Sequence, residues 1–195
     1  MMLNNTVITQ GNIGADDYVL HYNNDMDLLI KELRRREKET IRPVVSTNAL
    51  TFLTEKDLLN HKYQVKNIAN KSRLFLKIED IVYPVSENAF ISIRGRIEIY
   101  GKGLLELPDN LLRDVLNNRI KQYSQVRIIV IDEKIRAIFS ANRGGYKVIP
   151  TIDIVEETIN ALNAKFVNSK FHTAYLTYDI LYLKLLFPEK KETLQ

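Results

Sequence analysis

Apolar positions recur along this chain with two periods, and these periods divide it into expected helices and strands. A helix is expected within residues 23–42, where Asn24 or Asp25 supplies a cap and the apolar stripe comprises Met26, Leu29, Ile30 and Leu33. The charges that follow alternate in sign, from Glu32 through Arg34, Arg35 and Arg36 to Glu39, which predicts a solvated helix end with internal ion pairs. A second, short helix is expected from Thr54 to Asn60.

Two further helices are predicted after prolines. The strongest helical pattern follows Pro108, and its apolar face comprises Leu112, Leu116, Ile120 and Tyr123. The other follows Pro150, where Asp153 and Glu156 have capping-box spacing and the buried stripe comprises Val155, Ile159, Leu162 and Phe166.

Alternation with a period of two predicts strands in the remaining segments. Leu74, Leu76 and Ile78 alternate with polar or aromatic neighbours in residues 72–83. In residues 89–103, one predicted side carries Ile91, Ile93, Ile97 and Ile99, with Gly95 as a bulge or close crossing, and the other carries Ser92, Arg94, Arg96, Glu98 and Tyr100. A hairpin is expected over residues 125–141, turning around Asp132 to Lys134, and one long aromatic strand over residues 172–187.

The order of these elements predicts an α+β fold: a largely antiparallel sheet with two main helices packed on one face, plus an N-terminal helical segment. The expected organisation is a flexible arm (residues 1–20), the N-terminal helical segment (21–61), an α+β core (62–188) and a polar tail (189–195). A chain of 195 residues suits one buried core with an appendage.

Composition narrows the functional classes. With no cysteine, disulfides, thiolate catalysis and cysteine-bound zinc are excluded. No apolar run approaches the length of a bilayer span and the N-terminus lacks the order of a secretion signal, so we expect a protein of the host-cell cytoplasm or associated with a virion. The net charge is +4, and its surplus lies between Pro84 and Pro150, with 11 Lys/Arg against 7 Asp/Glu.

Residues 104–159 carry a family resemblance. The predicted helix precedes a hairpin whose second strand, Arg136, Ala137, Ile138, Phe139 and Ser140, is followed by Tyr146. This arrangement resembles part of a phage/plasmid-like protein family of unknown function, in which that strand has the pattern R-A-hydrophobic-L-S-x-x-Y. The likeness covers roughly a third of the chain, and the segment ANRGGY departs from the shorter linker of the family. The resemblance implies an origin in a mobile element and no particular activity.

The sequence offers little support for an enzyme. His21, His61 and His172 lack metal-ligand spacing, no serine lies in a nucleophile elbow, and Gly101 to Gly103 lacks the rest of a phosphate-binding loop. We therefore predict no catalytic residue, no metal and no cofactor. An enzyme whose site is assembled from scattered polar residues is the third interpretation.

Two clusters suggest a surface for single-stranded nucleic acid. The outward face of the predicted sheet would carry Arg94, Arg96, Tyr100 and Arg136, with Arg73 and Lys77 possible additions, and cations beside an aromatic suit a backbone with stacked bases. The loop around Gly144 and Gly145 would add an anion-binding concavity formed by Arg143, Tyr146 and Lys147. The structural alternative is that the strand cations prevent edge pairing and that the glycines only turn the chain.

The first hypothesis from the sequence is therefore a non-enzymatic phage or plasmid accessory protein that binds single-stranded nucleic acid. The alternative is a structural or interaction protein, such as a virion component or an inhibitor of a host protein, whose arm and tail become ordered on a partner or in a homo-oligomer.

Overall fold

The computed structural model describes residues 20–59, 63–66, 72–99, 103–141, 149–166, 170–178 and 181–187. These residues form two compact units: one contains residues 20–38 and the described part of 149–187, and the other the described part of 39–141. This division differs from the boundaries expected from the sequence. The expected N-terminal helical segment is shared between both units, and so is the expected 62–188 core. The arm up to residue 19 and the tail lie outside the described residues.

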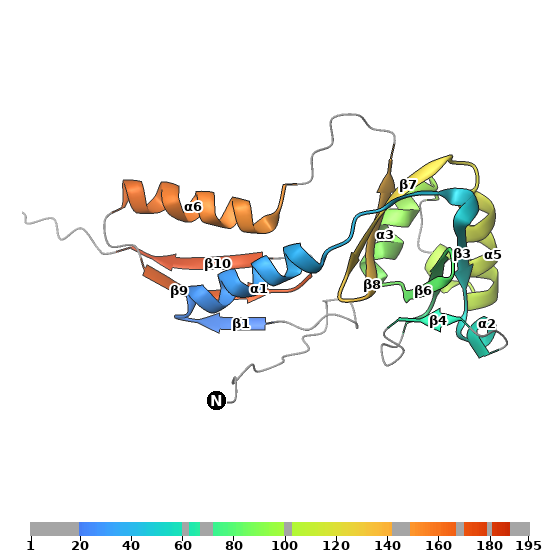
Figure 1. Cartoon of the computed structure of the whole chain (residues 1–195), viewed down its shortest axis with the longest axis horizontal. Coiled ribbons are helices and arrows are strands. Elements are labelled where there is room, and N and C mark those ends of the chain that lie inside the picture. The colour runs from blue at the N-terminus through green and yellow to red at the C-terminus, as the bar shows by residue number, and fades with distance from the viewer. Residues whose placement is uncertain are drawn as a thin grey trace, which may run out of the picture. The chain divides into compact units, whose positions relative to one another are not determined.

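The first unit is a three-stranded antiparallel sheet with two helices (Figure 1). The strand order is β1-β9-β10, and the strands are β1 (Leu20–Asn23), β9 (Lys170–Leu176) and β10 (Leu181–Leu186). The helices are α1 (Met26–Glu39) and α6 (Thr151–Lys165). Leu20, assigned to the arm from the sequence, begins the first strand.

Both helices of this unit pack on the same face of the sheet. Leu29 and Leu33 of α1 and Ile152 and Val155 of α6 are buried in one cluster with the sheet residues Tyr22, Ala174 and Leu176. These sheet residues share a face because side chains alternate along each strand and the register pairs Tyr22 with Ala174. Burial on one side therefore leaves the opposite side of the sheet without a helix among the described residues.

Helix α1 lies within the predicted segment and begins after a predicted cap, but its charged end is more buried than expected. Asp25 caps the helix, since its Oδ1 accepts the Leu28 N–H at 2.9 Å. Glu32 forms the expected internal ion pairs with Arg35 and Arg36, both at 2.8 Å. Arg36 is buried and donates to the carbonyl oxygen of Thr177 at 2.6 Å, so this part of the helix is anchored to the sheet unit rather than solvated.

The second unit contains two sheets that share one core (Figure 1). The first has the order β2-β7-β8, comprising β2 (Val44–Ser46), β7 (Gln125–Ile131) and β8 (Lys134–Ser140). The second has the order β3-β5-β6-β4, comprising β3 (Leu50–Leu53), β5 (Phe75–Ile78), β6 (Ile81–Pro84) and β4 (Gln64–Val65). A bridge between Val85 and Ile135 connects the two sheets.

Three helices, α3 (Glu87–Arg96), α4 (Gly103–Glu106) and α5 (Asp109–Ile120), contribute buried residues to this second core. The unit also contains α2 (Glu55–Leu59) and a 3₁₀ turn, η1 (Thr47–Ala49). The predicted apolar face of α5 is buried at Leu112, Leu116 and Ile120. The hairpin predicted within 125–141 is confirmed, and its two turn residues, Asp132 and Glu133, both have positive φ, as the tight turns favoured in hairpins require. The expected α+β class is thus confirmed.

The strand predicted within residues 89–103 is wrong, because residues 87–96 form helix α3. Ser86 starts this helix, since its Oγ accepts the Ala89 N–H at 3.1 Å. The buried residues Ala89, Phe90 and Ile93 recur at helical spacing, whereas Ile91 is 61% exposed. The many β-branched residues suggested a strand, but the capping serine and burial against the core determine a helix.

Gly95 provides a direct test of this correction. It lies exposed in α3, and a methyl group added there would meet no atom within 4 Å. Because glycine costs about 1 kcal/mol relative to alanine in a helix interior, we expect Gly95→Ala to raise the free energy of unfolding by up to that amount. Gly95→Val is the matched control. In urea unfolding, the alanine variant should be more stable than the valine variant. The reverse order is expected for a strand and would contradict the helix.

The long strand predicted over residues 172–187 is also wrong. The segment forms two strands, β9 and β10, which pair antiparallel with Leu176 opposite Leu181. No Gly, Pro or Asn lies between them, so the sequence carries no strong turn signal. In the part of the chain that the structure describes, no helix is both long and apolar enough to cross a membrane.

Candidate nucleic-acid interface

The residues predicted to form a cationic sheet face do not do so. Arg94 and Arg96 lie in the last turn of α3, while Arg136 is buried on β8. The single predicted sheet with these cations on its outward face is therefore wrong, because residues 74–139 contribute to two sheets and several helices. Tyr100, Arg143, Tyr146 and Lys147 lie outside the described residues.

The other cations of that expected face are engaged within the fold. The guanidinium of Arg96 lies 3.8 Å from the centroid of the Tyr123 ring. Arg73 binds Asp109 and the carbonyl oxygen of Leu107. The ammonium of Lys77 lies 5.3 Å from the centroid of another ring, that of Tyr63. Stacked or paired side chains of this kind stabilise the protein and are poorly placed for a phosphate backbone.

A different surface combines aromatic rings with cations, the features that the sequence analysis assigned to residues 89–103. It is the side of the β1-β9-β10 sheet opposite the helices, which we call the open face. Alternation and register place eight side chains there: His21, Asn23, Lys170, Thr173, Tyr175, Tyr182, Lys184 and Leu186. Lys170 belongs to this side because the register shifts between Lys184 and Leu185, which places Lys170 opposite Leu186. None of these side chains is acidic.

An aromatic row crosses the open face, with one ring from each strand. His21 is directly opposite Tyr175, and Tyr175 is directly opposite Tyr182. The ring centroids of His21 and Tyr175 are 4.7 Å apart in an edge-to-face arrangement, and those of Tyr175 and Tyr182 are 5.6 Å apart with the planes tilted by 32°. Tyr175 is 39% and Tyr182 52% exposed, so both rings are accessible.

Polar and cationic groups lie beside the row. The neighbouring row contains Asn23, Thr173 and Lys184, and the Thr173 hydroxyl donates to Asn23 Oδ1 at 2.9 Å. Lys184 is exposed two residues after Tyr182, and side chains at that spacing share one face of a strand. Lys170 is exposed farther along β9. The open face thus combines stacking surfaces with two ammonium groups.

Part of this aromatic surface could be predicted from the sequence. It showed that residues 172–187 were aromatic and alternating, but a single long strand separates Tyr175 from Tyr182 by seven positions. Only the hairpin brings the two rings opposite each other, and only the pairing of β1 adds His21, which the sequence left without a partner. The face is therefore a product of strand pairing.

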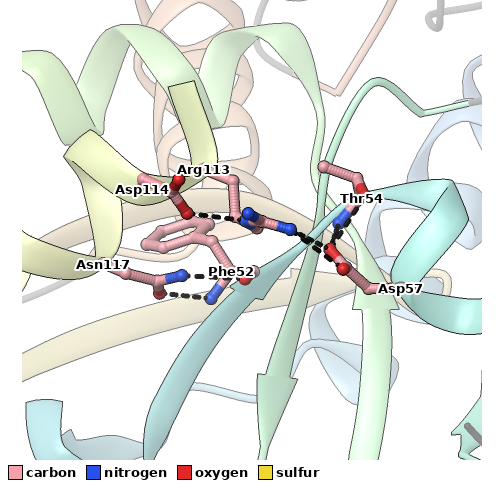
Figure 2. Close-up of polar contacts among 6 residues, drawn as sticks. All are labelled: Phe52, Thr54, Asp57, Arg113, Asp114 and Asn117. Carbon is pink, nitrogen blue, oxygen red and sulfur yellow. Dashed lines mark hydrogen bonds and ion pairs between the residues drawn. The ribbon is translucent and has the colours of Figure 1, made fainter. Parts of the chain in front are cut away.

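A second polar cluster, in the other unit, serves structure instead. Figure 2 shows Arg113 of α5 between Asp114 and Asp57, with its Nη1 2.9 Å from both carboxylate oxygens of Asp57. Asp57 also accepts the N–H and the hydroxyl of Thr54, at the start of α2. Burial raises the pKa of Asp57, but these hydrogen bonds outweigh it and hold the pKa below its ordinary value.

The same cluster fixes the edge of a sheet. The side chain of Asn117 accepts the Phe52 N–H at 2.7 Å and donates to the Phe52 carbonyl oxygen at 3.0 Å (Figure 2). Strand β3 is at the edge of its sheet, so this amide substitutes for a neighbouring strand. Among the residues that the structure describes, no group of three or more His, Asp or Glu is arranged to hold a metal ion.

Comparison with protein-family models, with curated proteins and with solved structures gave no match for this chain. The resemblance of residues 104–159 to a phage/plasmid-like family stays a prediction.

Proposed function

We propose that this is a non-enzymatic protein that binds single-stranded nucleic acid on the open face of its β1-β9-β10 sheet. One observation carries the proposal: Tyr175 and Tyr182 of the aromatic row are exposed, and Lys184 lies two residues from Tyr182 on the same face, with Lys170 farther along the sheet. Every base has a π-face, so accessible rings bind single strands with little sequence preference. The phage or plasmid origin rests on the sequence resemblance alone.

Helix packing on the other side supports this interpretation. Two helices cover one face of a small sheet and bury Tyr22, Ala174 and Leu176 there, so exposed aromatics on the opposite face are not needed for the core. Duplex DNA is a poorer ligand because its bases are stacked and paired, and because two lysines supply few of the phosphate contacts that duplex binding requires.

Tyr182→Leu is expected to weaken binding of a labelled oligo-dT or oligo-U strand. Base stacking on an aromatic contributes about 1 to 3 kcal/mol, which corresponds to roughly 5- to 150-fold in Kd. Tyr182→Phe keeps the ring and should bind about as well as the unsubstituted protein. Fluorescence anisotropy at low salt measures both variants, with a duplex of the same length as a competitor. Equal affinities of the leucine and phenylalanine variants would remove the proposal.

Salt dependence tests the two lysines in the same assay. Each phosphate contact to a single strand contributes about −0.7 to the slope of log K against log salt, so two contacts predict about −1.4. Lys184→Gln should reduce the magnitude of that slope by about one contact. Arg119→Gln is the control, since it removes the same charge from an exposed position on α5. Equal slopes for these two variants would exclude Lys184 from the site.

A second candidate function is protein–protein interaction, which was the alternative hypothesis from the sequence. The observation that favours it is a groove beside an edge strand in the second unit, which is independent of the open face.

A further inference from the structure

A groove of about 410 Å³ lies in the second unit between β2 and the end of the β5-β6 hairpin. Its walls are mainly apolar and include Ile41, Val44, Ile78, Ile81 and Tyr83. Ile41 and Val44 are 49% and 48% exposed, which leaves two branched apolar side chains in water. This volume is within the range of binding pockets and is large enough for a few side chains.

The backbone of β2 is oriented to pair with another strand at this groove. Strand β2 is at the edge of its sheet, and its antiparallel partner is β7. The Ile128 N–H donates to the Pro43 carbonyl oxygen at 3.0 Å, and the Thr47 N–H donates to Ser124 at 3.1 Å. Because such bonds alternate along a strand, Val44 directs its N–H and C=O groups, and Ser46 its N–H, away from β7. The Ser46 carbonyl belongs to the start of η1, where Ser46 is the N-cap.

The charge of the groove determines which kind of ligand is complementary to it. Of the described residues that line it, Glu79 alone is charged, and the adjacent Asp80 is also exposed at the turn of the hairpin. In a protein with a net charge of +4, this is a local acidic site at one end of an apolar groove. An occupant with a cation at that end is complementary in charge.

We propose that the edge of β2 and this groove bind an extended peptide with apolar residues at alternate positions and a Lys or Arg beside Glu79. Such a peptide adds a strand to the sheet: its backbone bonds Val44 and the Ser46 N–H, its alternate side chains enter the groove, and its cation pairs with Glu79. The site does not depend on nucleic-acid binding by the other unit.

Ser46→Pro tests the proposal without disturbing the existing pairing. Ser46 has φ of −62° and ψ of 133°, a conformation that proline adopts, and its N–H points away from β7. Peptides are first selected on the unsubstituted protein from a displayed library of random linear peptides. Selected sequences should alternate apolar residues and carry a basic residue. Their anisotropy-measured affinity should fall at least about tenfold in Ser46→Pro, since one main-chain hydrogen bond and the approach of the strand are lost.

Two further variants distinguish loss of the Ser46 N–H from other effects of the substitution and test the role of Glu79. Ser46→Ala retains the N–H and should bind within about twofold, and Glu79→Gln should weaken peptides with a basic residue severalfold. If Ser46→Pro does not fold, amide exchange in the unsubstituted protein gives the same information, because bound peptide should slow exchange at Val44 and Ser46. Equal binding to the proline and alanine variants, or selection of no alternating peptide, overturns the proposal. A dimer by light scattering that Ser46→Pro dissociates overturns it as well, because a second copy then occupies the edge.

Discussion

Replacing Arg36 with methionine is expected to lower the free energy of unfolding of the first unit by about 3 to 5 kcal/mol, the usual cost of removing one partner from a buried ion pair. The Arg36 side chain is 8% exposed and that of Glu32 16%, so the pair is shielded from water. Arg36 also donates to the Thr177 carbonyl oxygen, and its guanidinium lies 4.4 Å from the Tyr178 ring centroid. Methionine keeps the apolar stem but none of these contacts.

The ionisation of Glu32 agrees with this view of the pair. Burial raises the pKa of Glu32, but hydrogen bonds from Arg35 and Arg36 outweigh it and hold the pKa below the ordinary value of 4.5. The carboxylate is therefore the form that the folded unit stabilises. Of the two arginines that contact the Glu32 carboxylate at 2.8 Å, the substitution removes Arg36 and leaves Arg35.

Arg34→Met is the matched control for Arg36→Met. Arg34 precedes Arg36 by two residues on the same helix and forms an ion pair with Glu156 at 2.6 Å, but its side chain is 67% exposed. An exposed pair contributes at most about 1 kcal/mol, so this variant should unfold nearly as the unsubstituted protein does. Hydrogen exchange with mass spectrometry assigns the losses to segments. Equal losses in the two variants, or a loss confined to residues 39–141, would contradict the anchoring role of Arg36.

Asn117→Leu is expected to destabilise the second unit by about 2 to 4 kcal/mol, because two buried backbone groups lose their partners at about 1 to 3 kcal/mol each and the leucine recovers some apolar burial. Phe52 is fully buried, so water cannot replace the lost amide at its N–H or its carbonyl oxygen. The edge of β3 should therefore open first, and the Phe52 amide should exchange faster than its neighbours.

Asn118→Leu provides the comparison. Asn118 is the next residue of α5 and is exposed, so the same chemical change there removes no contact with β3. Urea unfolding should show a difference of at least about 2 kcal/mol between the two variants. Similar stability of both would mean that the Asn117 amide does not replace a strand at the edge of the sheet.

The two wrong strand predictions show where local pattern was insufficient. Ile93 and Ile97 fit a period of two with Ile91 and Ile99, and they also fit a helical face with Ala89 and Phe90. Which pattern forms depends on what covers it, since the core buries the helical set and leaves Ile91 in water. The candidate site was misplaced for the same reason, because Arg94 and Arg96 were assigned to a face that exists only if residues 89–103 form a strand.

The sequence alone determined the positions of the helices α1, α2, α5 and α6, the β7-β8 hairpin and the α+β class, because prolines, apolar stripes and the cap of α1 are local and act over a few residues. The details of α6 differ from expectation: within the described residues its start has no side-chain cap bond, and Phe166 of the expected buried stripe is 44% exposed. Tertiary structure decided the division into two units, the helix at 87–96 and the aromatic row, which requires residues 21, 175 and 182 to meet across three strands. Such pairings depend on burial and hydrogen bonding between segments far apart in the chain, and no local pattern encodes them.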